Sequence, residues 1–279
     1  MAILGVIVAA CTPSPGTSTS PTIGTSTTSP TPSSTLPPVV ECPGEGEFQE
    51  GGGIADIDGE GSDSSTIGRI SWQTSDLCET FTLQFETSQG APATAVPDIR
   101  VDHLESFQVI RVSVDVESAV ITDQLVETNL VERLYAVRSL DGGMFVDLHL
   151  AEPAAVRVAT TASPARLSLD LRPGFVPFAG QSNTGEHVVL VAPTAEATVE
   201  AATQLTGYAR DVESNVLVVV TQGGEMVTRA NATTADSLDT WGEFRVEVGL
   251  PPGRVSVFVG EESPEDGSLE GLTVDLTVS

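Results

Sequence analysis

Three histidines, His103, His149 and His187, are the side chains best suited to acid–base or metal chemistry. No two of them stand at the spacing of paired metal ligands, and none accompanies a serine or cysteine nucleophile signature. His149 lies beside Asp147 on the polar side of an alternating segment. The pattern indicates surface or edge histidines. It predicts no catalytic, cofactor-binding or metal-binding residue, and hence a non-enzymatic protein that uses no cofactor.

An acidic, glycine-rich run is a second candidate for metal binding: Asp56-Ile57-Asp58-Gly59-Glu60-Gly61-Ser62-Asp63. Counted from Asp56, it matches positions 1, 3, 5 and 6 of a calcium-binding EF-hand loop. Position 12 is Ile67 where such a loop has a bidentate glutamate, and no helical pattern flanks the run. The run is interpreted as a solvated acidic loop, and a calcium-dependent structural wall protein stays open as an alternative.

Charge excludes several classes of function. All 12 basic residues are arginine, so chemistry that depends on a lysine Schiff base or a phosphate-loop lysine is absent. A net charge of −27 repels the phosphates of nucleic acids, and no nucleic-acid partner is expected. With 39 acidic residues, an accessory or cryptic glycan hydrolase remains an alternative. It requires two carboxylates that converge across a cleft at about 5–10 Å.

Cys11 ends an apolar run formed by residues 2–10. That run is too short to cross a bilayer, which takes about 20 residues, but it has the length of a signal-peptide core. Val8-Ala9-Ala10-Cys11 resembles the lipobox of bacterial lipoproteins, in which the cysteine sulfur receives a diacylglycerol. Cys11 is therefore the predicted lipidation site and membrane anchor. Since no basic residue precedes the run, residues 1–11 are expected to be a truncated signal peptide with its lipobox.

Residues 12–41 consist almost entirely of Ser, Thr, Pro and Gly, which cannot form a core and predict a disordered tether. At a rise of ~3 Å per residue this tether reaches up to ~90 Å from the membrane. Cys42 and Cys78 are the remaining cysteines. In an exported, oxidising setting they are predicted to form a disulfide, and two free thiols are the alternative.

From about residue 66 onward, apolar and polar residues alternate with the period of a β-strand. The clearest segments are 80–86, 110–116, 144–150 and 167–172. A helical turn is also compatible with residues 123–138. Aromatic residues make up only 5% of the chain, which predicts cores of aliphatic side chains. Four larger aromatics are interpreted as core anchors rather than sugar-stacking platforms: Trp72, Trp241, Tyr135 and Tyr208.

A cluster of Pro, Gly, Ser and Asn interrupts this pattern and predicts a linker at residues 175–186. The chain is thereby divided into a domain at 42–174 and a domain at 187–279. The second domain contains further strand-like segments: Val188–Val191, Gln204–Ala209, Asn215–Thr221, Phe244–Val248, Val255–Val259 and Leu272–Val278. Six or seven short strands in so few residues indicate a β-sandwich. The expected fold class is all-β, with two small β domains behind the tether.

Two resemblances to known families add to this interpretation. The stretch from about Ile67 to Pro173 resembles the AMIN-like domain of actinobacterial lipoproteins. That resemblance is carried by Val131–Arg138, Met144–Leu150, Pro153–Val158 and Ser163–Leu171. The stretch from about His187 to Ser279 resembles the immunoglobulin-like domain of bacterial spore-germination proteins. It is carried by Val191-Ala192-Pro193, Leu205–Arg210 with Glu213, Trp241–Phe244 and Glu262–Ser268.

The resemblances imply an extracytoplasmic, β-rich protein that binds peptidoglycan or an envelope protein, and neither family supplies catalytic residues. The expected function is therefore a non-catalytic binding or scaffolding module. It is anchored by the lipid on Cys11 to the outer face of the cell membrane, and it presents its domains to cell-wall polymer or to an envelope protein.

Overall fold

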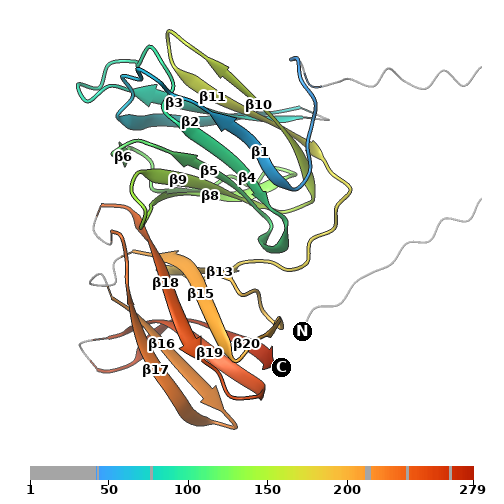
Figure 1. Cartoon of the computed structure of the whole chain (residues 1–279), viewed down its shortest axis with the longest axis vertical. Coiled ribbons are helices and arrows are strands. Elements are labelled where there is room, and N and C mark those ends of the chain that lie inside the picture. The colour runs from blue at the N-terminus through green and yellow to red at the C-terminus, as the bar shows by residue number, and fades with distance from the viewer. Residues whose placement is uncertain (1–41, 43, 76–77, 211–214, 237–238, 264–265) are drawn as a thin grey trace, which may run out of the picture. The chain divides into compact units, whose positions relative to one another are not determined.

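The computed structural model describes residues 42, 44–75, 78–210, 215–236, 239–263 and 266–279. This part of the chain forms twenty β-strands and one short 3-10 helix, so the predicted all-β class is confirmed (Figure 1). Within the same residues no helix is long and apolar enough to span a membrane. The predicted signal peptide, the lipidation site Cys11 and the tether at 12–41 lie outside the described residues.

Strands β1 to β11 form what is here called the N-terminal lobe. They are β1 (Gly52–Ile57), β2 (Thr66–Thr74), β3 (Glu79–Glu86), β4 (Ile99–Leu104), β5 (Val109–Val114), β6 (Ser118–Ala119), β7 (Asp123–Leu125), β8 (Val131–Arg138), β9 (Met144–Leu150), β10 (Ala154–Thr161) and β11 (Arg166–Pro173). One sheet has the order β10-β11-β3-β2-β6. A second runs β1-β4-β5-β9-β8, with β7 paired to β8. Apolar side chains from both sheets pack into one core.

The alternation in β3 and β11 explains why these segments form strands. Phe81, Leu83 and Phe85 are buried, whereas the threonines and Gln84 between them are half-buried. Strand β11 repeats the pattern and pairs with β3 in antiparallel register, with Leu167 opposite Leu83. Because every second residue faces the core, one face of this sheet supplies the apolar surface that holds the lobe together.

Strands β12 to β20 form the C-terminal lobe. They are β12 (Asn183–Thr184), β13 (Val188–Ala192), β14 (Thr198–Val199), β15 (Ala202–Ala209), β16 (Asn215–Gln222), β17 (Glu225–Thr233), β18 (Trp241–Gly249), β19 (Gly253–Glu262) and β20 (Leu269–Val278). The β18-β15-β13-β12 layer faces a sheet of order β14-β20-β19-β16-β17 across a second apolar core. The predicted β-sandwich is therefore present, and β17 and β14 are strands that the sequence pattern did not reveal.

The two lobes share one sheet of ten strands. Its continuity depends on a short parallel pairing of β18 with β8, in which Trp241 is opposite Val137. A third cluster of buried side chains lies at this junction: Tyr135, Val137, Phe145, Val189, Val191, Tyr208 and Trp241. Strand β9 is consequently buried on both faces, whereas the sequence predicted a polar face for it.

Three expectations need correction. Residues 123–138 contain strands β7 and β8 rather than a helical turn, because Leu134 to Val137 are all buried within the sheet. The acidic run begins inside strand β1, where Asp56 pairs with Arg100, so it is not a free loop over its whole length. The end of the predicted linker belongs to the C-terminal lobe, since β12 pairs with β13 and Ser182 is buried.

Candidate functional site

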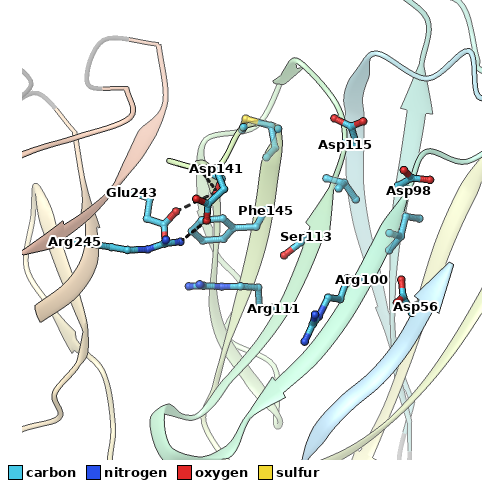
Figure 2. A pocket seen from close by; sticks show the side chains of 16 residues that line it. Asp56, Asp98, Arg100, Arg111, Ser113, Asp115, Asp141, Phe145, Glu243 and Arg245 are labelled. Atoms are coloured by element: carbon cyan, nitrogen blue, oxygen red, sulfur yellow. Dashed lines mark hydrogen bonds and ion pairs between the residues drawn. The ribbon is translucent and has the colours of Figure 1, made fainter. Parts of the chain in front are cut away.

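A groove of about 430 Å³ lies beside the shared sheet and is here called the junction groove (Figure 2). Its charged and hydroxyl-bearing lining residues are Asp56, Asp98, Arg100, Arg111, Ser113, Asp115, Ser139, Asp141, Glu243 and Arg245. They come from β1, from β4 and β5 with the residues Asp98 and Asp115 that flank them, from the β8–β9 turn and from β18, so both lobes contribute. Five carboxylates and three guanidinium groups therefore face one concave surface.

Arg111 is the fixed cation of this groove. Its guanidinium donates two hydrogen bonds to Asp147, at 2.8 and 2.7 Å, and lies 4.0 Å from the centroid of the Phe145 ring. The Asp147 side chain has no exposed surface. Burial by itself lowers the pKa of Arg111, but the Asp147 carboxylate outweighs it, so the pKa of Arg111 is raised. The groove thus carries a positive charge that stays in place at any ordinary pH.

Glu243 links the two lobes along one wall of the groove. One carboxylate oxygen accepts hydrogen bonds from the Ser139 hydroxyl at 3.1 Å and the Leu140 backbone N–H at 3.0 Å. The other oxygen accepts from Arg245, which also reaches Asp141 at 2.9 Å (Figure 2). These contacts hold the Glu243 carboxylate in place at the junction of the two lobes.

The opposite wall is more open. Arg100 donates two hydrogen bonds to Asp102, at 2.8 and 3.1 Å, and 66% of its side chain is exposed. The Asp98 carboxylate accepts from the backbone N–H of Gly59 at 2.6 Å. Asp56 and Asp115 complete this side of the groove. Such a surface suits a partner that carries both carboxylates and amines, because it offers fixed groups of both signs.

His149 is buried, so the surface or edge location that the sequence predicted for it is wrong. The reason is that the C-terminal lobe covers the second face of β9. Nδ1 of His149 is 2.8 Å from the Ser182 hydroxyl, and Nε2 is hydrogen-bonded to the Tyr208 hydroxyl. Burial lowers the pKa of His149 to about 3. A base that weak does not activate a serine, so the contact is structural.

The other two histidines differ from each other. His103 is also buried, and its Nδ1 accepts a hydrogen bond from the Gly51 N–H at 3.1 Å. Burial lowers the pKa of His103 below its ordinary value. The side chain of His187 is 36% exposed. The structure brings none of the three together, and the described residues contain no group of three or more His, Cys, Asp or Glu able to hold a metal ion.

One carboxylate of the acidic run accepts hydrogen bonds from within the protein. Asp63 accepts hydrogen bonds from the Thr94 and Ala95 backbone N–H groups at 2.8 and 3.1 Å. The Thr94 contact is the main reason that the pKa of Asp63 is lowered. Only Asp56, at the start of the run, reaches the junction groove. The run therefore contributes one wall residue rather than a set of converging ligands.

The expected core anchors and the disulfide are in place. Tyr135, Tyr208 and Trp241 lie in the junction cluster with ring centroids 5.0 to 5.8 Å apart. Trp72 is half-buried and stacks on Phe81 at 6.2 Å. Cys42 and Cys78 form a disulfide with their Cα atoms 5.5 Å apart. The disulfide predicted from the odd cysteine count is therefore present.

Comparison with known families bears on the C-terminal lobe, whose geometry is a two-layer sandwich built around β15 and β18. Residues 187–268 match the family described as the immunoglobulin-like domain of bacterial spore germination. The curated proteins and the solved structures gave no match. The immunoglobulin-like domain contains β18, and with it Glu243 and Arg245, so it supplies one wall of the junction groove.

Sequence reasoning missed the groove residues because they look like ordinary surface charges. Glu243 and Arg245 share one face of a strand, and Asp141 sits in a glycine turn. One signal was visible: Asp147 interrupts a segment whose other residues are almost all apolar. A carboxylate in such a segment indicates a buried partner of opposite charge, which the structure identifies as Arg111.

His149→Gln is expected to flatten the dependence of stability on pH. An unfolded histidine has a pKa of about 6.5, so between pH 6.5 and 3 the unfolded state binds more protons than the folded state. The stabilisation of the folded state by neutral His149 is fully present above pH 6.5 and is lost as the pH falls. From pH 7 to pH 4.5 the wild type should lose about 2–3 kcal/mol more than the variant. Urea unfolding at both pH values measures this difference. His187→Gln, at a partly exposed histidine, is the control, and parallel curves for His149→Gln and wild type would contradict the assignment.

Proposed function

We propose that this chain is a lipid-anchored, extracytoplasmic binding protein whose junction groove holds the charged peptide part of the cell wall. The lipobox resemblance at Cys11 and the tether at 12–41 support the anchor. The disulfide between Cys42 and Cys78 is the chemistry of an exported protein. The proposal assigns no catalytic step to the chain.

The observation that carries the proposal is the charge pattern of the groove. The peptide stems of peptidoglycan carry both carboxylates and amines, whereas its sugars are largely neutral. Three guanidinium groups and five carboxylates on one concave surface match such a zwitterionic polymer. Arg111 and Glu243 are held by partly buried hydrogen bonds, so this surface is preorganised and loses little entropy on binding.

The resemblance of the N-terminal lobe to the AMIN-like domain points in the same direction. Proteins of that kind are thought to act in peptidoglycan or envelope protein binding. Residues 187–268 match an immunoglobulin-like domain of bacterial spore germination, which is compatible with a binding role for the second lobe. A rigid pair of lobes at the end of a long tether would present the groove to the wall while the lipid stays in the membrane.

The test is co-sedimentation of the full chain, carrying Cys11→Ala, with purified peptidoglycan across a salt series. Pelleting that survives moderate salt is expected. Arg100→Gln should weaken it by about threefold to tenfold, since it removes one charged donor of the groove. Arg254→Gln is the matched control, because its side chain is 67% exposed, is likewise ion-paired and does not line the groove. Protein that stays in the supernatant would overturn the wall assignment, and crosslinking would then seek an envelope protein.

The lipid anchor has its own test. After detergent phase separation of bacterial cells that express the chain, the mature protein is expected in the detergent phase. Cys11→Ala should move it to the aqueous phase. A wild-type protein that partitions into the aqueous phase would refute the anchor while leaving the wall-binding result unaffected.

A further inference from the structure

A second pocket, here called the Arg133 pocket, has a volume of about 490 Å³. Its lining includes Gln108, Glu132, Arg133, Ser182, Thr184 and Glu186. It shares no lining residue with the junction groove. Like the groove, it is formed by strands of the N-terminal lobe and by the segment that enters the C-terminal lobe.

Arg133 lines this pocket without forming an ion pair, in a very acidic protein. Eight of the twelve arginines form ion pairs within the described part of the chain. No carboxylate among those residues lies within ion-pair distance of the Arg133 guanidinium, which makes one long hydrogen bond, at 3.4 Å, to the Tyr135 hydroxyl. The guanidinium lies 5.8 Å from the Tyr135 ring and is thereby held at the pocket wall. Most of its N–H donors are free to bind an anion.

Gln108 supplies the complementary acceptor. It follows the 3-10 helix Glu105–Phe107 and adopts a left-handed conformation, with φ of 59°. Its backbone carbonyl is fixed by a hydrogen bond from the Leu150 N–H at 2.8 Å. Its side-chain oxygen is buried and has no hydrogen-bond partner among the described residues. A buried acceptor without a donor is unfavourable, and a strained residue of this kind is typical of binding sites.

The rest of the lining is polar and partly rigid. Ser182 is buried, and its hydroxyl is 2.8 Å from Nδ1 of His149. Glu132 and Glu186 are exposed carboxylates that also line the pocket. A simple anion would be repelled by these two glutamates, and a simple cation would be repelled by Arg133. A ligand that carries one charge of each sign satisfies both.

We propose that the Arg133 pocket binds a small zwitterion of the amino-acid or short-peptide type. Its carboxylate is bound by the Arg133 guanidinium, and its ammonium donates to the Gln108 side-chain oxygen and to the glutamate carboxylates. The volume has room for a dipeptide. This site is independent of the proposed wall-binding function, because the groove and the pocket use different residues.

The probe is glycylglycine, titrated into the full chain carrying Cys11→Ala and followed by NMR shifts. Two analogues each lack one charge: N-acetyl-glycylglycine has no ammonium, and glycylglycinamide has no carboxylate. Glycylglycine is expected to bind, and each analogue to bind at least about tenfold more weakly, as loss of a charge-assisted contact implies. Equal binding of the three, absence of glycylglycine binding, or preferential binding of N-acetylglucosamine would overturn the proposal.

Variants locate the site. Arg133→Gln and Gln108→Asn are each expected to weaken glycylglycine binding by about tenfold, and asparagine tolerates the left-handed backbone of position 108. Arg166→Gln is the matched control, since Arg166 is exposed and also has no ion pair among the residues that the structure describes. Unchanged affinity in a folded Arg133→Gln protein would refute the assignment. Peptidoglycan pelleting should be the same in Arg133→Gln as in wild type, which separates this result from the groove.

Discussion

Asp147→Asn is expected to lower the free energy of unfolding by about 3 kcal/mol, because it leaves the charge of Arg111, whose side chain is only 21% exposed, without its buried counter-ion. Asp147 is fully buried, and both of its carboxylate oxygens accept hydrogen bonds from Arg111. Asparagine keeps the size of the side chain, so packing around Val146 and Leu148 is preserved. The measurement is urea unfolding at pH 7, with the slope of the transition checked for two-state behaviour.

Asp102→Asn provides the matched control. Asp102 also receives two hydrogen bonds from an arginine, but that arginine, Arg100, is 66% exposed. Water replaces the lost partner there, and the expected cost is below about 1 kcal/mol. Arg111→Met combined with Asp147→Leu should recover most of the loss, since a buried ion pair is usually replaceable by apolar side chains. Similar losses in Asp147→Asn and Asp102→Asn would contradict the dependence on burial.

The sequence shows the two-residue period of a β-strand wherever one face of that strand is exposed to solvent. Segments 80–86 and 167–172 alternate because β3 and β11 bury one side only, and both were predicted. Segment 144–150 alternates in the same way, yet all seven residues of β9 are buried. Its second face is covered by side chains from β13, β15 and β18. The alternation in β9 does not show that its second face is covered, and His149 was therefore misplaced at the surface.

The disulfide and the core aromatics were predictable because each follows from composition. Assigning one of three cysteines to a predicted lipobox leaves a pair, and large aromatics in an aromatic-poor chain belong in cores. The junction groove was not predictable. Asp56 and Arg245, on opposite walls of the groove, are almost 190 positions apart and meet only because β8 pairs with β18. In the sequence each looks like a solvated charge, since one-dimensional patterning carries no information on which charges converge.

The roles of Arg133 and Gln108 in the second pocket were likewise not predictable from the sequence. Arg133 follows Glu132 in the chain, and a reader of the sequence would assign it a neighbouring acid as partner. Both side chains line the same pocket, yet no ion pair joins the Glu132 carboxylate to the Arg133 guanidinium, whose hydrogen bond goes to the Tyr135 hydroxyl. Gln108 carries no sequence signal of its left-handed backbone, because such a conformation is typical of glycine or asparagine. A site that depends on an arginine without an ion pair and on a left-handed glutamine can be recognised only in the three-dimensional structure.

Cys42→Ser with Cys78→Ser is expected to destabilise the protein by about 4 kcal/mol relative to the oxidised wild type. The disulfide links two cysteines that are 36 positions apart in the sequence. Without it the unfolded chain has more conformational entropy, which favours unfolding. Cys78 immediately precedes β3, whose Glu79 carboxylate accepts a hydrogen bond from the Leu130 N–H. The bond therefore joins the beginning of the described chain to a strand of the main core. Thermal unfolding should show a fall of about 8–16 °C.

Wild-type protein unfolded in the presence of a thiol reductant is the matched comparison, and it should match the double variant. Cys42 also has its backbone carbonyl hydrogen-bonded by Arg157 at 3.3 Å, a contact that reduction leaves intact. The native fold is therefore expected to persist in the reduced state at moderate temperature. The loss of stability should appear as a lower midpoint of thermal unfolding. If oxidised and reduced wild type melt at the same temperature, the bond does not contribute to stability. The contacts of Arg157 with the Cys42 and Gly44 carbonyls and the backbone pairing of Gln49 with Val156 would then suffice to hold this segment on the N-terminal lobe.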